Sequence, residues 1–381
     1  MKTKQFIWED GWESYDEKEN FEAELVIFFG GSTEDFANNR YKELAEKFPT
    51  AQILGCTTAG EIIGDEVLED GASAVAIQFE KTPFKGSSLT ITKSEDSYQA
   101  GLEIGNQLKT DDLKVLFVLS DGNIVNGDEL VKGLREVVSD EVSITGGLAG
   151  DGGAFNKTFV CYNGEAVAGQ IAAIGLYGDA IKIGFGSVGG WDAFGPMRSV
   201  TKSSSNVLYE LDGKPALELY KSYLGDEAEN LPGSALQFPI MIRPAGQDGT
   251  GTVRTILSVD EDHQSLTFAG DIPEGYEAQL MMASFEHLVN GAGSAAKHAV
   301  ASEVSNVQDG EKLALLVSCV GRKMVLGQRT EDEVEAVVDA LDDNTAILGF
   351  YSYGEICPHE EMGFCHLHNQ TMTITYLAEE V

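Results

Sequence analysis

Apolar and polar positions follow one another along the chain in a pattern that returns. A dense apolar run, AELVIFFGG, precedes EDFANNRYKELAEKF, whose apolar residues recur at helical spacing, and a second short apolar run, AQILG, follows. Such runs predict buried strands, and a spacing of three to four residues predicts a helix. The same order recurs near the C-terminus in KLALLVSCVG, TEDEVEAVVDALDD and AILG, where Thr330 and Glu333 predict a capping box for the helix.

Each second strand leads into a glycine-rich segment, which we call a hook. The first hook (residues 56–61) ends the phrase ILGCTTAGEI, and the third hook (350–355) ends ILGFYSYGEI, which has the same first three and last three residues. A degenerate copy lies between them, LKVLFVLSDG, GDELVKGLREVVSD and VSITGGLAGDGG, with the second hook at 149–153. After each hook the chain returns as a strand-like run. The repeated unit is therefore strand, helix, strand, hook and returning strand.

These units predict the fold class and the domains. Right-handed crossovers place the helices against a sheet, so we expect an α/β fold with mixed sheets and two domains related by duplication. Between the second and third units lies a strand-rich stretch with the turns GQDGTG and IPEG and a helix from about Pro215. A boundary near Gly213 gives an N-terminal extension (1–22), an N-terminal domain (23–213) and a C-terminal domain (214–381).

Charge narrows the choice of partners. The 381 residues carry a formal net charge of -36, with 62 acidic and 26 basic side chains spread along the chain. Such a field repels phosphate backbones and anionic lipid surfaces, so we expect no nucleic-acid or membrane partner. Acidity of this kind supports solubility and does not point to a substrate.

Cysteine usage and the N-terminal sequence indicate the compartment. Five scattered cysteines form an odd set, which argues against a disulfide framework and for a reducing environment. The first 20 residues turn acidic where a signal peptide needs an apolar stretch. The longest apolar runs, such as LVIFF and LALLV, are too short to span a bilayer. We therefore expect a cytoplasmic protein.

Several ordered motifs resemble one family. GCTTAGEI, GGLAGDGG, PALELYKSYLG, FAGDIPEG and the closing GFYSYGEI and CHLHNQTMT are similar to FIST proteins, bacterial sensory proteins with an N-terminal and a C-terminal FIST domain. The resemblance begins near Ala23 and covers nearly the whole remaining chain. It implies small-ligand sensing coupled to a histidine kinase, a cyclic-di-GMP enzyme or a chemotaxis pathway. One branch of the family resembles haem-containing nitric-oxide sensors.

The hooks are the first candidates for a ligand site. Their glycines allow the close backbone approach that a ligand cradle needs, although a simple turn between strands needs it as well. The middle of the first phrase is small and hydroxylic and that of the last is aromatic, so facing hooks would give one polar wall and an aromatic floor. Glu61 and Glu355 either bind a ligand amine or cap backbone N–H groups. The candidate residues are Gly55, Cys56, Thr57, Thr58, Glu61, Gly150, Asp151, Tyr351, Tyr353 and Glu355.

Three further polar residues have two interpretations each. Asp151 either binds a ligand or satisfies its own turn. Arg254, a scarce positive charge, either binds an anionic group of the ligand or forms an ordinary salt bridge. Asn369, in the stretch HNQT that is generic to FIST proteins, either contacts the ligand or has an orienting or structural role, and the same holds for His368.

Histidines raise the possibility of haem b. The segment CPHEEMGFCHLHN concentrates cysteines and histidines, but their spacing matches no standard zinc finger. No CxxCH attachment site is present, so any haem would be bound non-covalently. At most one or two of the candidate axial ligands would be real. They are His287, His298, His359, His366 and His368.

Three functional hypotheses follow. The first is a cytoplasmic sensor that binds a small ligand between its domains and signals through a separate partner, a histidine kinase or a cyclic-di-GMP enzyme; its sharpest form is a haem-based nitric-oxide sensor. The second is a haem-free sensor of amino acids or related metabolites, and the third is a ligand-free adaptor. No GxSxG, HExxH, Walker or kinase motif is present, so we expect no enzyme.

Overall fold

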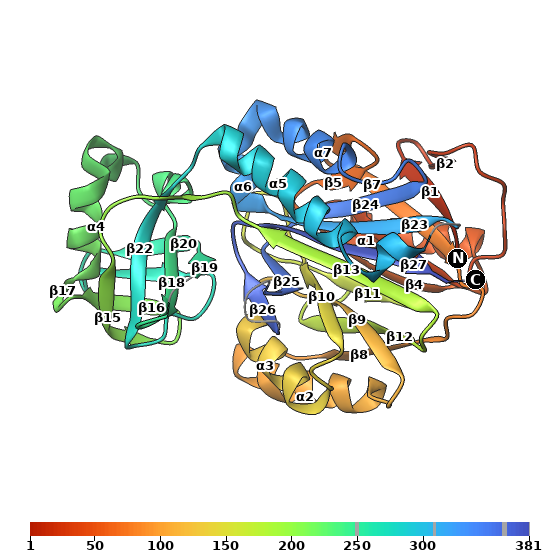
Figure 1. Ribbon diagram of the computed structural model, residues 1–381, viewed down its shortest axis with the longest axis horizontal. Coiled ribbons are helices and arrows are strands. Elements are labelled where there is room, and N and C mark those ends of the chain that lie inside the picture. The colour runs from red at the N-terminus through yellow and green to blue at the C-terminus, as the bar shows by residue number, and fades with distance from the viewer. Residues whose placement is uncertain (248–250, 308–309, 360–363, 381) are drawn as a thin grey trace.

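The computed structural model describes residues 1–247, 251–307, 310–359 and 364–380. Its strands form three six-stranded sheets and one nine-stranded sheet within these ranges. The six-stranded sheets build the larger body on the right of Figure 1, and the nine-stranded sheet belongs to the smaller unit on the left. The predicted class, α/β with mixed sheets, is confirmed.

The three six-stranded sheets share one plan. In each, a leading strand pairs antiparallel with the returning strand, the returning strand pairs antiparallel with the first strand of the unit, and the first strand runs parallel to the second. In this order the strands are β1 (Lys2–Trp8), β7 (Ala72–Gln78), β3 (Leu25–Gly30) and β4 (Gln52–Cys56); β8 (Phe84–Thr90), β12 (Gln170–Tyr177), β9 (Leu113–Ser120) and β10 (Ser143–Leu148); and β13 (Ile181–Val188), β27 (Met372–Glu379), β23 (Lys312–Cys319) and β24 (Thr345–Ser352). The predicted unit is thus present three times.

Each hook carries the chain to the edge of another unit's sheet. After the first hook, β5 (Glu61–Ile63) and β6 (Glu66–Leu68) extend the third sheet beside β24. After the third hook, β25 (Gly354–Pro358) and β26 (Cys365–His368) extend the second sheet beside β10. After the second hook, β11 (Val160–Tyr162) joins β4 in the first sheet, whose other edge is β2 (Trp12–Ser14). The exchange closes a cycle, which brings the three hooks together.

The three sheets enclose one hydrophobic core. Phe29 of the first sheet and Phe350 of the third lie with ring centroids 4.5 Å apart, and Leu119 of the second sheet joins the same cluster. On β3 the alternate residues Val26 and Phe28 face the opposite way, toward the first helix. Both faces of the strand are therefore covered, which explains why the sequence shows continuous apolar runs rather than alternation.

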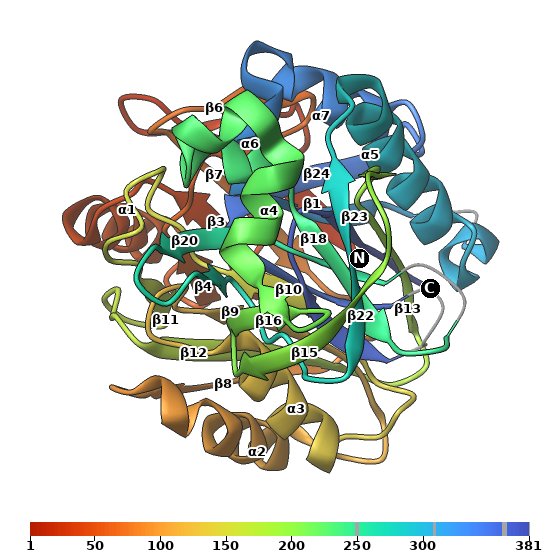
Figure 2. The ribbon, with the colours of Figure 1, turned by 90° about the vertical axis from the view of Figure 1, so that its left-hand side faces the viewer.

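Helices cover the outer faces of these sheets. Figures 1 and 2 show α2 and α3 below the body and α5 to α7 above it. Side-chain oxygens of Thr33 and Asn126 accept backbone N–H groups at the starts of α1 and α3. The helices are α1 (Glu34–Lys47), α2 (Ser97–Leu108), α3 (Gly127–Val137), α4 (Ala216–Leu224), α5 (Phe285–Val300), α6 (Val320–Leu326) and α7 (Thr330–Val338), with 3-10 turns η1 (Ser94–Asp96), η2 (Gly225–Asn230), η3 (Gly233–Gln237), η4 (Glu303–Asn306) and η5 (Gly327–Arg329).

The smaller unit lies between β13 and α5 in the chain, and we call it the inserted unit (residues 192–282). Its hydrophobic core is separate and contains Leu208, Leu217 and Phe268, with α4 packed on the sheet. The boundary predicted near Gly213 lies in the turn between its paired strands β16 and β17. Its strands are β14 (Asp192–Ala193), β15 (Arg198–Ser204), β16 (Val207–Leu211), β17 (Lys214–Pro215), β18 (Ile240–Pro244), β19 (Thr252–Arg254), β20 (Ile256–Asp260), β21 (Ser265–Phe268) and β22 (Tyr276–Met282).

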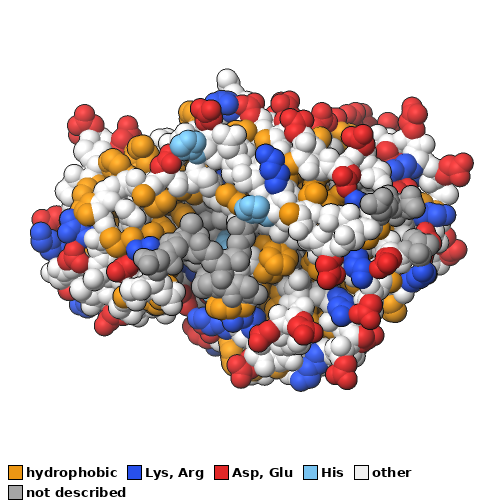
Figure 3. Space-filling model, in the orientation of Figure 1, with side chains coloured by type: hydrophobic (Ala, Val, Ile, Leu, Met, Phe, Trp, Pro, Cys, Tyr) orange, Lys and Arg blue, Asp and Glu red, His pale blue; other side chains and the backbone are white. Residues whose placement is uncertain are grey.

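The surface carries the acidic character of the sequence. Figure 3 shows acidic side chains distributed over the visible face of both the body and the inserted unit rather than gathered in one patch. Among the described residues, no helix combines the length and the apolar character needed to cross a bilayer.

Candidate ligand-binding site

The three hooks contact one another through backbone hydrogen bonds. In the second hook, the N–H of Gly150 donates to the carbonyl of Thr57 at 3.0 Å, and the N–H of Gly152 donates to that of Thr58, also at 3.0 Å. On its other side the first hook pairs with Tyr351 of the third, because Ala59 N–H donates to the Tyr351 carbonyl at 2.8 Å. The first hook therefore pairs through its backbone with both of the other hooks.

Two glycines make this arrangement possible. Gly60 has a φ of +129°, which side-chain-bearing residues rarely adopt. At Gly150 a Cβ atom would lie 2.9 Å from the backbone nitrogen of Ala59, so only glycine allows the second hook to approach the first so closely. Glycine is thus needed at position 60 for its backbone conformation and at position 150 for the contact between the hooks.

A pocket of about 380 Å³ opens where the first hook meets the second hook and α6. The first hook supplies Thr58 to Glu61, the second hook supplies Gly152 and Gly153, and α6 supplies Val320, Lys323 and Met324. Ser32, Glu69 and Asp70 complete much of the wall.

Glu61 is the buried carboxylate of this pocket. Its Oε1 accepts the N–H of Gly31 at 3.2 Å and the Thr58 hydroxyl, and its Oε2 accepts the N–H of Gly71 at 3.2 Å. Burial raises the pKa of this carboxyl to about 8, although the hydrogen bonds and the charge of Lys323 oppose the shift. The folded protein therefore holds the proton of Glu61 more tightly than an exposed carboxyl group would.

Lys323 is the positive group of the pocket. Its ammonium donates to the carbonyl of Ala59 at 2.7 Å and to the carboxylate of Glu69 at 2.8 Å, and it lies 5.3 Å from the ring centroid of Tyr351. The Glu69 side chain is 72% exposed, so this ion pair contributes little to stability and can exchange for a ligand anion. The pocket thus offers an exchangeable cation beside carboxylates.

Glu355, at the matching place in the last phrase, is sealed. Its carboxylate accepts the hydroxyl of Ser352 at 3.1 Å, and the hydroxyl and N–H of Thr371 at 2.7 and 3.1 Å. Burial raises its pKa to about 8 as well, but it does not line the pocket described above. The carboxylate holds the start of a returning strand.

The same contact occurs in all three units, and we call it the clasp: a buried carboxylate accepts the backbone N–H of the residue immediately before the returning strand. Glu61 accepts the N–H of Gly71, immediately before β7, and Glu355 accepts that of Thr371, immediately before β27. In the second unit the carboxylate comes from Asp121, which accepts the N–H of Gly169 before β12 at 3.0 Å. A backbone-capping role for both glutamates follows from this repetition.

The remaining hook candidates lie beneath or beside the pocket. Gly55 and Cys56 belong to β4, and Thr57 is buried against Phe159, whose N–H donates to its hydroxyl at 3.0 Å. The phenol of Tyr353 donates to the carboxylate of Asp151, and this carboxylate also accepts the N–H groups of its own loop at 2.7 and 2.8 Å. None of these candidates lines the pocket.

Tyr351, expected as part of an aromatic floor, is fully buried under the first hook. Its hydroxyl donates to Glu333 at 2.9 Å. Glu333 in turn accepts Arg322 of α6 at 2.8 Å, and neither side chain is exposed. The capping box predicted from Thr330 and Glu333 is wrong, since Thr330 is already helical and its hydroxyl donates to the carbonyl of Gly327 at 2.6 Å instead of accepting an N–H group of α7.

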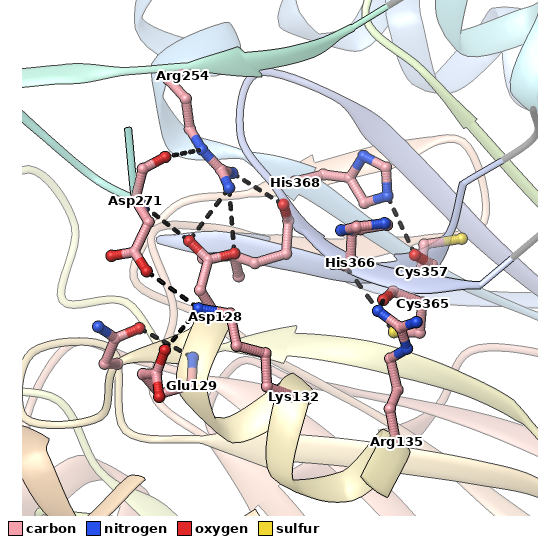
Figure 4. A network of polar contacts seen from close by, with 12 residues as sticks. Asp128, Glu129, Lys132, Arg135, Arg254, Asp271, Cys357, Cys365, His366 and His368 are labelled. Atoms are coloured by element: carbon pink, nitrogen blue, oxygen red, sulfur yellow. Dashed lines mark hydrogen bonds and ion pairs between the residues drawn. The ribbon is translucent and has the colours of Figure 1, made fainter. Parts of the chain in front are cut away.

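Arg254 belongs to the inserted unit and binds the body (Figure 4). Its guanidinium donates to both carboxylate oxygens of Asp128 at 3.1 Å and to the carbonyl of Leu367 at 2.9 Å. The N–H of Asp271 donates to the same carboxylate at 2.8 Å. Of the two interpretations of Arg254, the structure shows the salt bridge, which ties the inserted unit to α3 and β26.

The histidines divide into two exposed ones and a cluster. His287 and His298 lie exposed on α5, and His287 pairs with Asp192 at 2.8 Å. The ring centroid of His359 lies 6.2 Å from that of His366 and 5.8 Å from that of His368. Burial lowers the pKa of His366 and of His368 to about 3.

Of the clustered histidines, His368 does not fit haem, whereas Nε2 of His366 is buried without a hydrogen-bond partner among the described residues. Nε2 of His368 lies 3.0 Å from the carbonyl of Cys357 and its Nδ1 faces Ser187, so neither nitrogen is open to iron. A pocket of about 180 Å³ nearby is lined by Arg135 and Cys365 and by none of the three clustered histidines. Within the described ranges no three histidine, cysteine or carboxylate side chains are grouped as metal ligands.

Asn369 follows the cluster at the turn before β27. It is 1% exposed, and neither polar atom of its side chain has a hydrogen-bond partner among the described residues. The structure does not bring it to the hook pocket.

The sequence did not point to several residues of the pocket. Lys323, Met324, Gly152, Gly153 and Ser32 were not candidates, yet all line it. Lys323 had one signal, a basic residue four positions after the buried strand β23 in a chain with few basic side chains. Gly152 and Gly153 belong to the second hook, which the sequence did single out, whereas Ser32 and Met324 carry no local pattern that distinguishes them from ordinary loop or helix residues.

Comparisons with known proteins agree on the family. The FIST N domain model matches residues 24–214, and the FIST C domain model matches residues 216–358. An uncharacterized protein of Methanocaldococcus jannaschii, MJ1623, is 26% identical over 374 residues, which cover 87% of this chain and 70% of the relative. A cyanuric acid hydrolase structure from A. caulinodans matches at 12% identity over 79% of this chain and 100% of its own, but its TM-score of 0.20 supports no inference. FIST domains are sensory, ligand-binding signalling domains, and with both domain models matched in order the chain belongs to the FIST family.

Proposed function

We propose that this protein is a sensor whose small ligand binds in the hook pocket, between the first hook, the second hook and α6. One observation carries the proposal: the pocket combines backbone of two hooks with a lysine whose partner is an exposed, exchangeable carboxylate. Ligand sites of this kind are concave and place a few polar groups precisely enough to fix orientation.

The charges of the pocket favour a small molecule with an amine and a carboxylate. The ammonium of Lys323 would form an ion pair with the carboxylate of the ligand in place of Glu69. The freed Glu69, together with Asp70, would pair with the amine of the ligand. Amino acids and related metabolites have this chemistry. The haem version of the sensor receives no support from this pocket, because none of the described histidines lines it.

The output would be a separate signalling protein in the cytoplasm, a histidine kinase or a cyclic-di-GMP enzyme. Membership of a sensory rather than catalytic family supports this, and all five cysteines are free and buried, as suits a reducing compartment. A bound ligand would act by favouring one arrangement of the protein, which the partner binds differently.

A thermal-shift screen of the twenty amino acids tests the proposal. A ligand at about 100 times its Kd stabilises the native state by about 2.7 kcal/mol, so a true ligand raises Tm in a concentration-dependent way. Lys323→Met should abolish the shift. Lys221→Met, which removes an exposed lysine paired with Glu261 in the inserted unit, is the matched control and should keep it.

Two results would contradict the proposal. One is a screen in which no amino acid raises Tm. The other is a shift that is unchanged in Lys323→Met, because the ligand would then bind outside the hook pocket.

A further inference from the structure

We infer that the hook pocket is mechanically coupled to the inserted unit through a buried line of contacts, Tyr351, Glu333 and Arg322, so that filling the pocket changes how the two connections of the inserted unit are held. The inference rests on the proposed function for its biological meaning. It names the route by which pocket occupancy reaches another part of the molecule.

The line begins at the pocket wall. Ala59 and Gly60 line the pocket, and their backbones exchange two hydrogen bonds with Tyr351, each of 2.8 Å. The ammonium of Lys323, which also lines the pocket, lies 5.3 Å from the ring centroid of the same tyrosine. A ligand that displaces the first hook or Lys323 must therefore act on Tyr351.

The hydroxyl end of Tyr351 contacts Glu333. Its Oε1 accepts the hydroxyls of Tyr351 at 2.9 Å and Ser318 at 3.1 Å, and its Oε2 accepts the guanidinium of Arg322 at 2.8 Å. Tyr351, Glu333 and Arg322 are all fully buried. A buried ion pair depends on its geometry, because solvent cannot replace a lost partner. A displacement of Tyr351 therefore changes the geometry of the ion pair between Glu333 and Arg322.

Arg322 ends the line at the inserted unit. Its guanidinium donates to the carbonyl of Gly189, where the chain leaves β13, and to the carbonyl of Leu288 at 2.8 Å, where the chain has returned in α5. One side chain therefore holds both connections. Gly190 and Gly291 let these connections pack closely: a Cβ at Gly291 would lie 3.1 Å from the Cα of Gly190.

Two features of α6 strengthen the route. The helix contributes Lys323 and Met324 to the pocket while η3 of the inserted unit packs against it. The inserted unit is also attached to the body by the Arg254–Asp128 ion pair. A change at its two connections can therefore move the inserted unit about this second attachment. Coupling through discrete contacts of this kind requires a direct test.

The test fills the pocket without knowledge of its ligand. Ser32 lines the pocket and is half-buried, whereas all native cysteines are buried, so Ser32→Cys introduces an accessible thiol. N-ethylmaleimide then places a small adduct in the pocket, with stoichiometry checked by mass spectrometry. Hydrogen–deuterium exchange is compared with and without the adduct in peptides that cover residues 186–192 and 285–291.

The expected result is a change of about twofold or more in amide exchange at both connections, since exchange reports local opening. Tyr351→Phe on the same background should remove the response, and Glu333→Gln should do the same. Tyr376→Phe, which removes another buried phenol hydroxyl that contacts Asp342 and Thr345, is the matched control and should keep it.

Unchanged exchange at the connections after complete labelling would overturn the inference, as would a response that survives in Tyr351→Phe. Because the adduct replaces the natural ligand, these outcomes are independent of the amino-acid screen. A response to the adduct with no amino-acid binding would refute the proposed ligand and leave the coupling intact.

Discussion

The phrases that contain the first and third hooks begin and end with the same residues, but only the first hook lines the pocket. The first hook lies beside a pocket, with Thr58 and Glu61 in its wall, whereas the third hook buries Phe350 and Tyr351 completely and keeps Glu355 away from solvent. The shared Gly-Glu ending serves a structural clasp in both. The four residues between the shared ends of each phrase decide which hook lines a pocket. The small side chains of the first phrase leave space, whereas the aromatic side chains of the last phrase fill it.

The largest expected difference in stability is between loss of the buried Arg322–Glu333 ion pair, which Tyr351 of the third hook contacts, and loss of the Lys323–Glu69 ion pair beside the first hook. Glu333→Ala leaves Arg322 buried without its carboxylate and should cost about 3–5 kcal/mol of unfolding free energy. Glu69→Ala removes the exposed partner of Lys323 at the pocket mouth and should cost at most about 1 kcal/mol. Urea unfolding measures both, and similar costs would contradict the contrast between a sealed and an open hook.

A second comparison uses equivalent positions of the two phrases. Phe350→Ala empties the shared core beside Phe29 and should cost about 3–5 kcal/mol. Cys56→Ala, at the matching position, removes one sulfur atom and should cost about 1 kcal/mol. Equal losses in chemical denaturation would mean that the third hook does not support the core more than the first.

The two clasps predict a common pH dependence. Glu61 and Glu355 have pKa values near 8 in the folded protein, above the ordinary value of 4.5. A raised pKa means that the folded state binds the proton more tightly, so this contribution is fully present below pH 4.5 and is lost as pH rises through 8. Each group contributes a slope of up to about 1.4 kcal/mol per pH unit between these values.

Glutamine variants isolate that slope. Stability of Glu61→Gln and of Glu355→Gln, measured by urea unfolding from pH 5 to 9, should each depend less on pH than that of the wild type, and the double variant least. A wild-type slope retained in the double variant would show that neither carboxyl holds its proton in the folded state.

Two hydroxyl deletions, with effects smaller than loss of the buried ion pair, distinguish the clasp from the pocket. Thr58→Val and Ser352→Ala each remove a hydroxyl from a clasp carboxylate, and each should cost about 1–2 kcal/mol. Only Thr58→Val should also weaken binding of the stabilising amino acid in calorimetric titration, because Thr58 lines the pocket. Equal weakening by Ser352→Ala would place the ligand elsewhere.

Local pattern predicted the units because each carries its own signal. Continuous apolar runs such as β3 are buried on both faces, and the hook glycines mark close backbone contact. The exchange of β5, β25 and β11 between sheets could not be predicted, since strand pattern does not say which edge a strand joins.

The same limit applies to the pocket and its coupling. Glu333 has the spacing of a capping box, and only the fold shows that its carboxylate binds Arg322 instead. Lys323 reaches the first hook from a segment more than 250 positions later in the chain, so no short motif could connect them. Histidines drew attention through their local density, yet the structure places them away from the pocket.

The central claim is that ligand binds at the first hook, and methyl NMR of methionine-labelled protein tests it most directly. During titration with the amino acid that raises Tm most, the methyl signal of Met324, in the pocket wall, should shift saturably, while that of Met372, fully buried in the third unit, should shift little. A saturable shift at Met372 with Met324 unchanged would contradict the claim.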